Sequence, residues 1–182
     1  MSKYEQLVRR LVRCMNNSGL DYALTGAIAV SFYGSPRTTT DVDVMVAISG
    51  ATDVIKNKVT EALQCACLEF DERKISDALI SGYNIASFRD NTTPFRVDII
   101  FSGEKLDKQE SKIQGLNTFL QKPEALVLAK LRMIKATLPR ERATKDEQDI
   151  RAILAFTKVD LEAVKKQAKK DETFEILETL IQ

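Results

Sequence analysis

Two aspartates stand two residues apart in the stretch "TTTDVDVMVAI", at Asp41 and Asp43. Residues two apart in a strand face the same side, so both carboxylates share one face while Val42 and Val44 point to the other. Asp is disfavoured in strands, and neighbouring like charges repel each other. A hard divalent cation with oxygen ligands removes that repulsion. The spacing therefore predicts a metal site at the start of a strand.

A third carboxylate, Asp98, lies in a second β-rich run, "FRVDIIF". It alternates with Val97 and Ile99, and it meets Asp41 and Asp43 if strand 95–101 lies beside strand 41–48. Three carboxylates can hold two Mg²⁺ about 3.5–4 Å apart, which clamp the attacking and leaving oxygens of an in-line displacement. We therefore predict that Asp41, Asp43 and Asp98 bind Mg²⁺ or Mn²⁺.

Upstream of the paired aspartates, "LTGAIAV" has the pattern of a strand that turns at a glycine into a helix. The first turn of such a helix offers free backbone N–H groups and a positive dipole end to an anion. Gly26 allows close backbone approach, Ala27 keeps the entrance open, Thr25 offers a hydroxyl, and Arg37 offers a cation. The stretch predicts a phosphate site, although a plain tight turn at Gly26 and a solvated charge at Arg37 are open alternatives.

The segment "TGAIAV", in which Gly26-Ala27 is followed after thirteen residues by "DVDV", together with the later "VDII", resembles the nucleotidyltransferase superfamily related to DNA polymerase β. The resemblance implies that Asp41 and Asp43 bind both metals. It implies that Asp98 binds the catalytic metal and steers the attacking hydroxyl. Ala27 departs from the family pattern, which has Ser or Gly at this position, and it keeps the backbone donor while losing a hydroxyl.

The later stretch "KPEALVLAKLRMIKATLPRERATKDEQDI" resembles AbiEii-type toxins and related nucleotidyltransferases. Lys130 falls on the apolar stripe of Val127 and Ile134, where a lysine needs a partner. Asp146 falls with Ile150 on the inward face of the next helix. The resemblance implies that Lys130 contacts the nucleotide phosphates and that Asp146 shapes that site. The alternative is that the two side chains pair with each other and tie their helices together.

The resemblance implies an enzyme that transfers a nucleoside monophosphate from an NTP, such as ATP, to a hydroxyl. The expected acceptor is a tRNA or a protein, and a small molecule is also open. A toxin–antitoxin setting with a cognate partner protein is implied as well. The rival interpretation is a non-catalytic nucleotide sensor or antitoxin of the same fold, for which Ala27 is the main support.

The order of elements predicts an α+β fold, with a mixed sheet flanked by helices and a helical C-terminal extension. We expect a catalytic domain over 1–121 and an extension over 122–182 packed on it. "YNIASFRD" and "FRVDIIF" predict a hairpin, residues 104–114 a helix, and "LNTFLQ" an edge strand. From Pro123 onward the pattern predicts three helical pieces, broken near Pro139 and Thr157.

Composition excludes several classes of function. Lys and Arg total 27 against 26 Asp and Glu, so no overall field favours nucleic acid or a membrane surface. The chain has no histidine, which excludes Ser-His and Cys-His nucleophiles and His-ligated zinc. No signal peptide or membrane span is expected, and the chain is predicted to be cytoplasmic. Its three cysteines, Cys14, Cys65 and Cys67, are interpreted as unpaired core or surface residues.

Overall fold

The computed structural model describes residues 1–81, 84–137 and 143–182. The chain divides into two compact units, each of which is described by itself. The first unit comprises Met1–Ala27 and Thr38–Leu120, and the second comprises Ile28–Arg37 and Gln121–Gln182. The predicted assignment of catalysis to 1–121 and of an accessory role to 122–182 stays a prediction. No helix among the described residues is long and apolar enough to cross a membrane.

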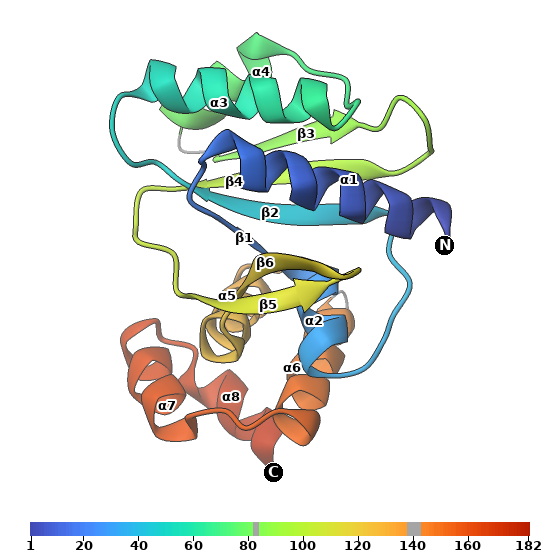
Figure 1. Cartoon of the computed structure of the whole chain (residues 1–182). Coiled ribbons are helices and arrows are strands. Elements are labelled where there is room, and N and C mark those ends of the chain that lie inside the picture. The colour runs from blue at the N-terminus through green and yellow to red at the C-terminus, as the bar shows by residue number, and fades with distance from the viewer. Residues whose placement is uncertain (82–83, 138–142) are drawn as a thin grey trace. The chain divides into compact units, whose positions relative to one another are not determined.

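A mixed sheet of six strands forms the frame of the first unit, in the order β3-β4-β2-β1-β6-β5 (Figure 1). β2 runs parallel to β4 and antiparallel to β1, while β3 is antiparallel to β4 as the predicted hairpin requires. β1 and β6 pair in parallel through Leu24 and Leu120. The α+β class is thus confirmed. The strands are β1 (Tyr22–Leu24), β2 (Asp41–Ala47), β3 (Ile85–Arg89), β4 (Arg96–Ser102), β5 (Lys108–Ile113) and β6 (Leu116–Gln121).

Helices pack on this sheet in the first unit: Figure 1 shows α1 (Lys3–Ser18) in front of β4 and β2, and α3 (Thr52–Cys65) packs against α1. The central strands turn their valines toward these helices, and Val42, Val44 and Val46 are fully buried. α1 begins at a capping box formed by Ser2 and Glu5, which satisfies two backbone donors that would otherwise lack partners. The same unit contains the shorter α4 (Glu72–Ile80) and the N-terminal end of α2 (Gly26–Tyr33).

A disulfide joins α1 to α3 between Cys14 and Cys65, with 5.8 Å between their Cα atoms. The prediction of three unpaired cysteines was therefore wrong for two of them. The sequence separation of 51 between the two cysteines hid the pairing, because only the packing of two distant helices brings them together. Cys67 is the exposed free thiol.

The predicted helix over 104–114 was wrong, because residues Lys108–Ile113 form strand β5. Gln114 and Gly115 both have positive φ, at 51° and 77°, and join β5 to β6 in a tight hairpin. β6 was predicted to be an edge strand, and it instead lies between β1 and β5. The polar sequence of β5 suits an edge, since charged edge strands resist pairing with other chains.

Within the described ranges, the second unit consists of four helices and residues 28–37, and α5 packs against α6, α7 and α8. The prediction of three helical pieces was wrong by one, because the chain also breaks around Glu172, where φ is 55°. The break predicted near Pro139 falls outside the described residues, and the break at Thr157 is confirmed. The helices are α5 (Pro123–Ala136), α6 (Thr144–Phe156), α7 (Leu161–Lys170) and α8 (Phe174–Ile181).

Candidate active site

The predicted carboxylates lie on neighbouring parallel strands. Asp43 of β2 is in register with Asp98 of β4, and Asp41 is in register with Arg96 two residues earlier on each strand. Their side chains share the sheet face opposite the buried valines, and all three aspartates are partly exposed. The predicted adjacency of the two strands is confirmed.

Each of the two outer carboxylates accepts a hydrogen bond from a nearby hydroxyl. The hydroxyl of Thr39 donates to Oδ1 of Asp41, and the hydroxyl of Ser87 donates to Oδ1 of Asp98. Sequence reasoning missed both hydroxyls. The signal for Ser87 was the hairpin itself, since the register of β3 against β4 places Ser87 directly opposite Asp98.

Gly26 provides the space that Asp43 occupies. Its φ is +57°, and a Cβ at this position would lie 1.8 Å from Oδ2 of Asp43, so no residue with a side chain fits without moving the carboxylate. The backbone N–H of Thr25 donates to the carbonyl oxygen of Asp43 at 3.0 Å and holds the two segments together. Thr25 and Ala27 are both buried, at 6% and 2% exposure. The start of α2 and the three aspartates Asp41, Asp43 and Asp98, here called the carboxylate row, are therefore direct neighbours in the first unit.

The donor set can be compared with the needs of a divalent cation. Carboxylate oxygens are the ligands that Mg²⁺ and Mn²⁺ prefer, and the absence of a side chain at Gly26 leaves room for one of these carboxylates, Asp43. As the side chains stand, no three acidic or thiol groups within the described ranges gather around one point. Asp41, Asp43 and Asp98 fit a divalent cation in the chemistry of their oxygens and in the register of their two strands.

A cluster of four charged side chains lies within the second unit. Nζ of Lys130 lies 2.8 Å from Asp146 and 2.7 Å from Asp149, and Nε of Arg37 lies 3.2 Å from the other oxygen of Asp149. Lys130 and Asp149 are nearly buried, at 7% and 4% exposure. Two cations thus neutralise two carboxylates, which is what burial of such groups requires.

Lys130 and Asp146 form the ion pair that the sequence analysis gave as the alternative to a phosphate site. Arg37 forms an ion pair with Asp149 and is not a solvated loop charge. Sequence reasoning placed Asp149 with Ile153 on the inward face of this helix, α6, but did not assign it to the site. Its partner Arg37 lies more than a hundred residues away in the chain, so only the fold could identify the pair.

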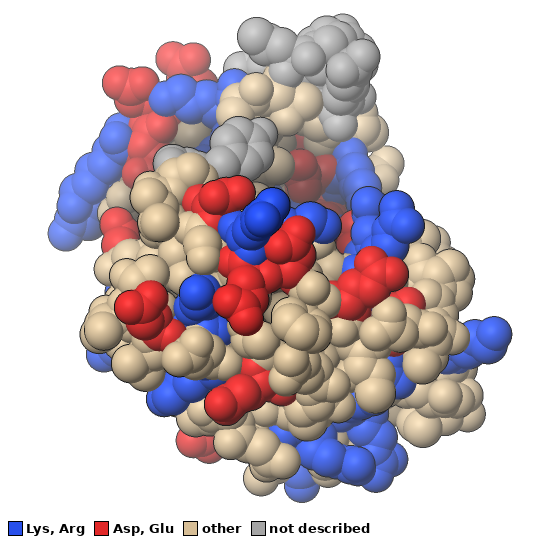
Figure 2. Space-filling view, turned by 90° about the horizontal axis from the view of Figure 1, so that it is seen from above, with Lys and Arg blue, Asp and Glu red and all other residues tan. Residues whose placement is uncertain are grey.

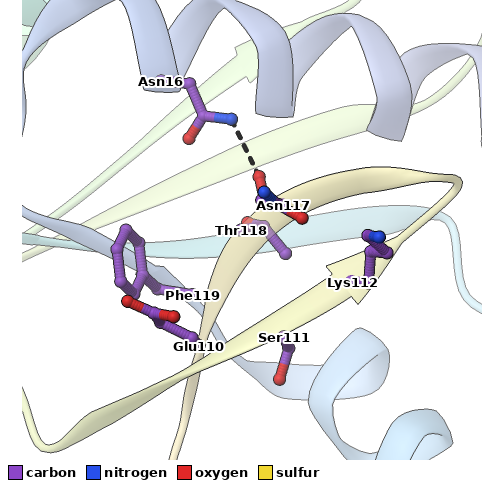
Figure 3. Close-up of a pocket in the computed structure, with 7 residues that line it drawn as sticks. All are labelled: Asn16, Glu110, Ser111, Lys112, Asn117, Thr118 and Phe119. Atoms are coloured by element: carbon purple, nitrogen blue, oxygen red, sulfur yellow. Dashed lines mark hydrogen bonds between the residues drawn. The ribbon is translucent and has the colours of Figure 1, made fainter.

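A cavity of about 670 Å³ lies elsewhere in the first unit and contains none of the predicted site residues (Figure 3). Asn16 of α1 reaches across it and donates to the carbonyl oxygen of Asn117 at 2.9 Å. Ser111 and Lys112 of β5 point in opposite directions in this view. The lining polar groups do not converge, and the carboxylate row is the better candidate for chemistry. The lining residues are Asn16, Glu110, Ser111, Lys112, Asn117, Thr118 and Phe119.

Solved structures provide the comparison with known proteins. No protein-family model matches the sequence, and no curated protein sequence matches it closely enough to count as a relative. The antibiotic-resistance factor ANT(2″)-Ia is similar in structure, with a TM-score of 0.67 and 11% identity over 97% of this chain and 95% of that one. Its complex with adenylyl-2″-tobramycin gives a TM-score of 0.64 at 12% identity, over 94% and 98%.

A third similar structure is an antigenic nucleotidyltransferase-like protein from Paracoccidioides brasiliensis. It superimposes with a TM-score of 0.56 and 15% identity over 85% of this chain and 78% of that one. At such low identity, a structural match reports on the fold alone. Together with the register of the two aspartate-bearing strands, these matches show that the chain has the nucleotidyltransferase fold.

Proposed function

We propose that this protein is a metal-dependent nucleotidyltransferase that transfers a nucleoside monophosphate from an NTP to a hydroxyl group. The observation that carries the proposal is the pairing of Asp43 with Asp98 on adjacent strands, with Asp43 seated against Gly26 at the start of α2. A phosphate-binding helix start beside a pair of carboxylates suits the handling of a metal–triphosphate.

The chain's own residues divide the work in this proposal. Asp41, Asp43 and Asp98 would hold Mg²⁺ or Mn²⁺, and the bound metal would stabilise the charge that develops on the transferred phosphoryl group. The backbone N–H groups at Gly26 and Ala27 donate hydrogen bonds to phosphate oxygens, because the first turn of a helix has donors without intrahelical partners. Asp98 orients the acceptor hydroxyl and accepts its proton.

Phosphate contact by Arg37 and Lys130, with Asp146 shaping that contact, stays a prediction. Each cation already has a carboxylate partner within its unit. A phosphate contact would require the cation to exchange a carboxylate oxygen for a phosphate oxygen, and both partners offer charge-assisted hydrogen bonds of similar strength.

The acceptor is open between three classes that share a hydroxyl. The resemblance of the C-terminal stretch to AbiEii-type toxins supports a tRNA or a protein, in a toxin–antitoxin setting with a cognate partner. The adenylyl-2″-tobramycin named with ANT(2″)-Ia supports a small polyol. The assay of the proposed function therefore offers all three.

The test is incubation of the purified protein with each α-32P-labelled NTP, Mg²⁺ or Mn²⁺, and in turn total tRNA, cell lysate and an aminoglycoside. Label is expected on one acceptor class, with pyrophosphate released. Asp43→Asn is expected to lower the rate by at least about 100-fold, because it removes a metal ligand and not merely a neighbouring group.

Asp53→Asn is the matched control, since Asp53 is an exposed acid in the first turn of α3 and lies outside the carboxylate row. Its rate should equal that of the wild type. Metal-dependent NTP binding without transfer to any acceptor would replace the proposal with the nucleotide-sensor alternative. Transfer that survives in Asp43→Asn would show that the chemistry occurs elsewhere.

A further inference from the structure

Ser87 lies opposite Asp98 in the β3–β4 hairpin, as its cross-strand partner. Its hydroxyl lies 2.5 Å from Oδ1 of Asp98. An ionised carboxylate has no proton to give, so Ser87 is the donor. Hydrogen bonds from a hydroxyl to a carboxylate are short and about twice as strong as neutral ones.

Asp98 consequently stands in a row of three side chains across three strands. Ser87 of β3 flanks it on one side, and Asp43 of β2 is its partner on the other. No ion pair with Asp98 occurs among the residues that the structure describes, so a hydroxyl, and not a cation, orients this carboxylate. Because Oδ1 already accepts the hydroxyl, Oδ2 is the oxygen that keeps both lone pairs for other partners.

We propose that Ser87 is a positioning residue for the transfer reaction, which fixes the side-chain torsion of Asp98 and selects the oxygen that it presents. This inference rests on the proposed function. A carboxylate held in one orientation loses less rotamer freedom when it binds a cation or an acceptor hydroxyl. Such supporting hydrogen bonds commonly change metal affinity or activity by about 10- to 100-fold.

Ser87 also lines a cavity of about 270 Å³ beside α4, together with Lys74 and Asp77. This position suggests a different role, in which the hydroxyl contacts the acceptor directly. Kinetics separate the two roles. A positioning residue changes kcat and metal affinity, whereas a direct acceptor contact changes the acceptor KM.

The experiment compares Ser87→Ala with Ser87→Thr, which keeps the hydroxyl and suits a strand. Mn²⁺ affinity is measured by electron paramagnetic resonance without NTP or acceptor, and kcat and acceptor KM are measured separately. Ser87→Ala is expected to weaken Mn²⁺ binding and lower kcat, each by about 10-fold, with acceptor KM unchanged. Ser87→Thr is expected to recover at least half of the loss on a logarithmic scale.

Ser102→Ala is the control for losing a strand hydroxyl, since the hydroxyl of Ser102 in β4 bonds to the backbone of Glu104 and, within the described ranges, to no carboxylate. It should match the wild type. Wild-type Mn²⁺ affinity in Ser87→Ala, or an effect confined to acceptor KM, overturns the inference and leaves the proposed function standing. If the Asp98→Asn variant binds Mn²⁺ as tightly as the wild type does, Asp98 is not a metal ligand, and both proposals fall.

Discussion

At position 26, even a methyl group would overlap the carboxylate of Asp43, and the residue that stands there has φ at +57°. Glycine is thus required twice, once by backbone conformation and once by space. The two requirements can be separated by mutation, because another glycine meets the first without the second. Gly115, in the β5–β6 turn, has φ at +77° and nothing within 4 Å of a built Cβ.

Gly26→Ala is expected to cost more stability than Gly115→Ala. Both substitutions place a side chain in the left-handed region, at about 1–2 kcal/mol, and only the first also displaces Asp43. Mn²⁺ binding should be lost in Gly26→Ala and retained in Gly115→Ala. Calorimetric melting and Mn²⁺ titration provide the measurements. Equal losses of melting temperature with Mn²⁺ binding intact in both variants would contradict the account of Gly26.

Sequence periodicity was sufficient to place Asp41 and Asp43 on one face of their strand, because alternation in a strand is a local rule. Asp98 reaches the same face of the sheet through the pairing of β2 with β4, which the sequence left as a condition. Periodicity was not sufficient for Ser87 or for the role of Asp149. Ser87 has an effect only through the hairpin register, and Asp149 only through a helix that meets a distant arginine. A single hydroxyl or buried carboxylate has no sequence periodicity that identifies its hydrogen-bond or ion-pair partner, so the partner becomes known only from the fold.

Among the elements, α1 and α3 are joined covalently by Cys14 and Cys65. Closing a loop with a sequence separation of 51 residues removes entropy from the unfolded chain. In the chain-entropy model this is worth about 4 kcal/mol at a separation of this size.

Reduction with dithiothreitol, or Cys14→Ser, is expected to lower the free energy of unfolding by up to about 4 kcal/mol. Urea denaturation measures the difference. Cys67→Ser is the matched control, because that thiol is free and exposed, and it should leave stability unchanged. Three alkylatable thiols in the unfolded, unreduced protein would contradict the disulfide.

Elements with an apolar face were predictable, and β5 was not. Its sequence, "KQESKI", carries no strong alternation of apolar and polar residues, and its exposure shows no fully buried position. The available signal was the turn after it, because Gln114–Gly115 places a glycine where a two-residue hairpin needs positive φ. The sequence of a polar edge strand therefore contains little signal for a strand apart from the turn that follows it.

On the scale of the whole molecule, charge is balanced, with 27 basic and 26 acidic residues. Figure 2 shows basic and acidic side chains interspersed over the face in view, without a broad patch of one sign. An interspersed surface gives little electrostatic steering of a polyanion. Whatever the acceptor is, its capture rests on local contacts.

Each unit contains a buried tyrosine whose pKa is raised. Burial is the main cause in both, and it raises the pKa of Tyr33 to about 12, with the charge of Glu124 adding to the effect. Burial likewise raises the pKa of Tyr22, against the hydrogen bond with Thr118, which lowers it. The hydroxyl of Tyr33 donates to the carbonyl oxygen of Gln121 at 2.9 Å.

Stability is therefore expected to be undiminished by these groups below pH 10 and to fall as pH rises from about 10 toward 12. The folded state resists loss of the phenolic proton, while the unfolded chain releases it near pH 10, so alkaline pH favours unfolding. The share of Tyr33 is at most about 3 kcal/mol. Urea denaturation at pH 8 to 11 should show a shallower decline for Tyr33→Phe than for the wild type, and equal slopes would refute the assignment.

The fold class of the whole chain was predictable, because the order of strands and helices constrains how layers can be built. The structural match at 11% identity agrees with it. The composition of the two units was not predicted in detail, since residues 28–37 cluster with the C-terminal helices and not with their sequence neighbours.

That clustering makes the chain pass between the units three times, after Ala27, after Arg37 and after Leu120. Within the second unit, Gly34 packs against the backbone of Ala152, and Tyr33 accepts a hydrogen bond from Thr157. A single cut after Leu120 would strip these partners from residues 28–37 and expose an apolar helical end. Neither unit can therefore be excised by a cut at one junction. A fusion that uses the second unit as a module must include residues 28–37, which contain most of α2, together with the C-terminal helices.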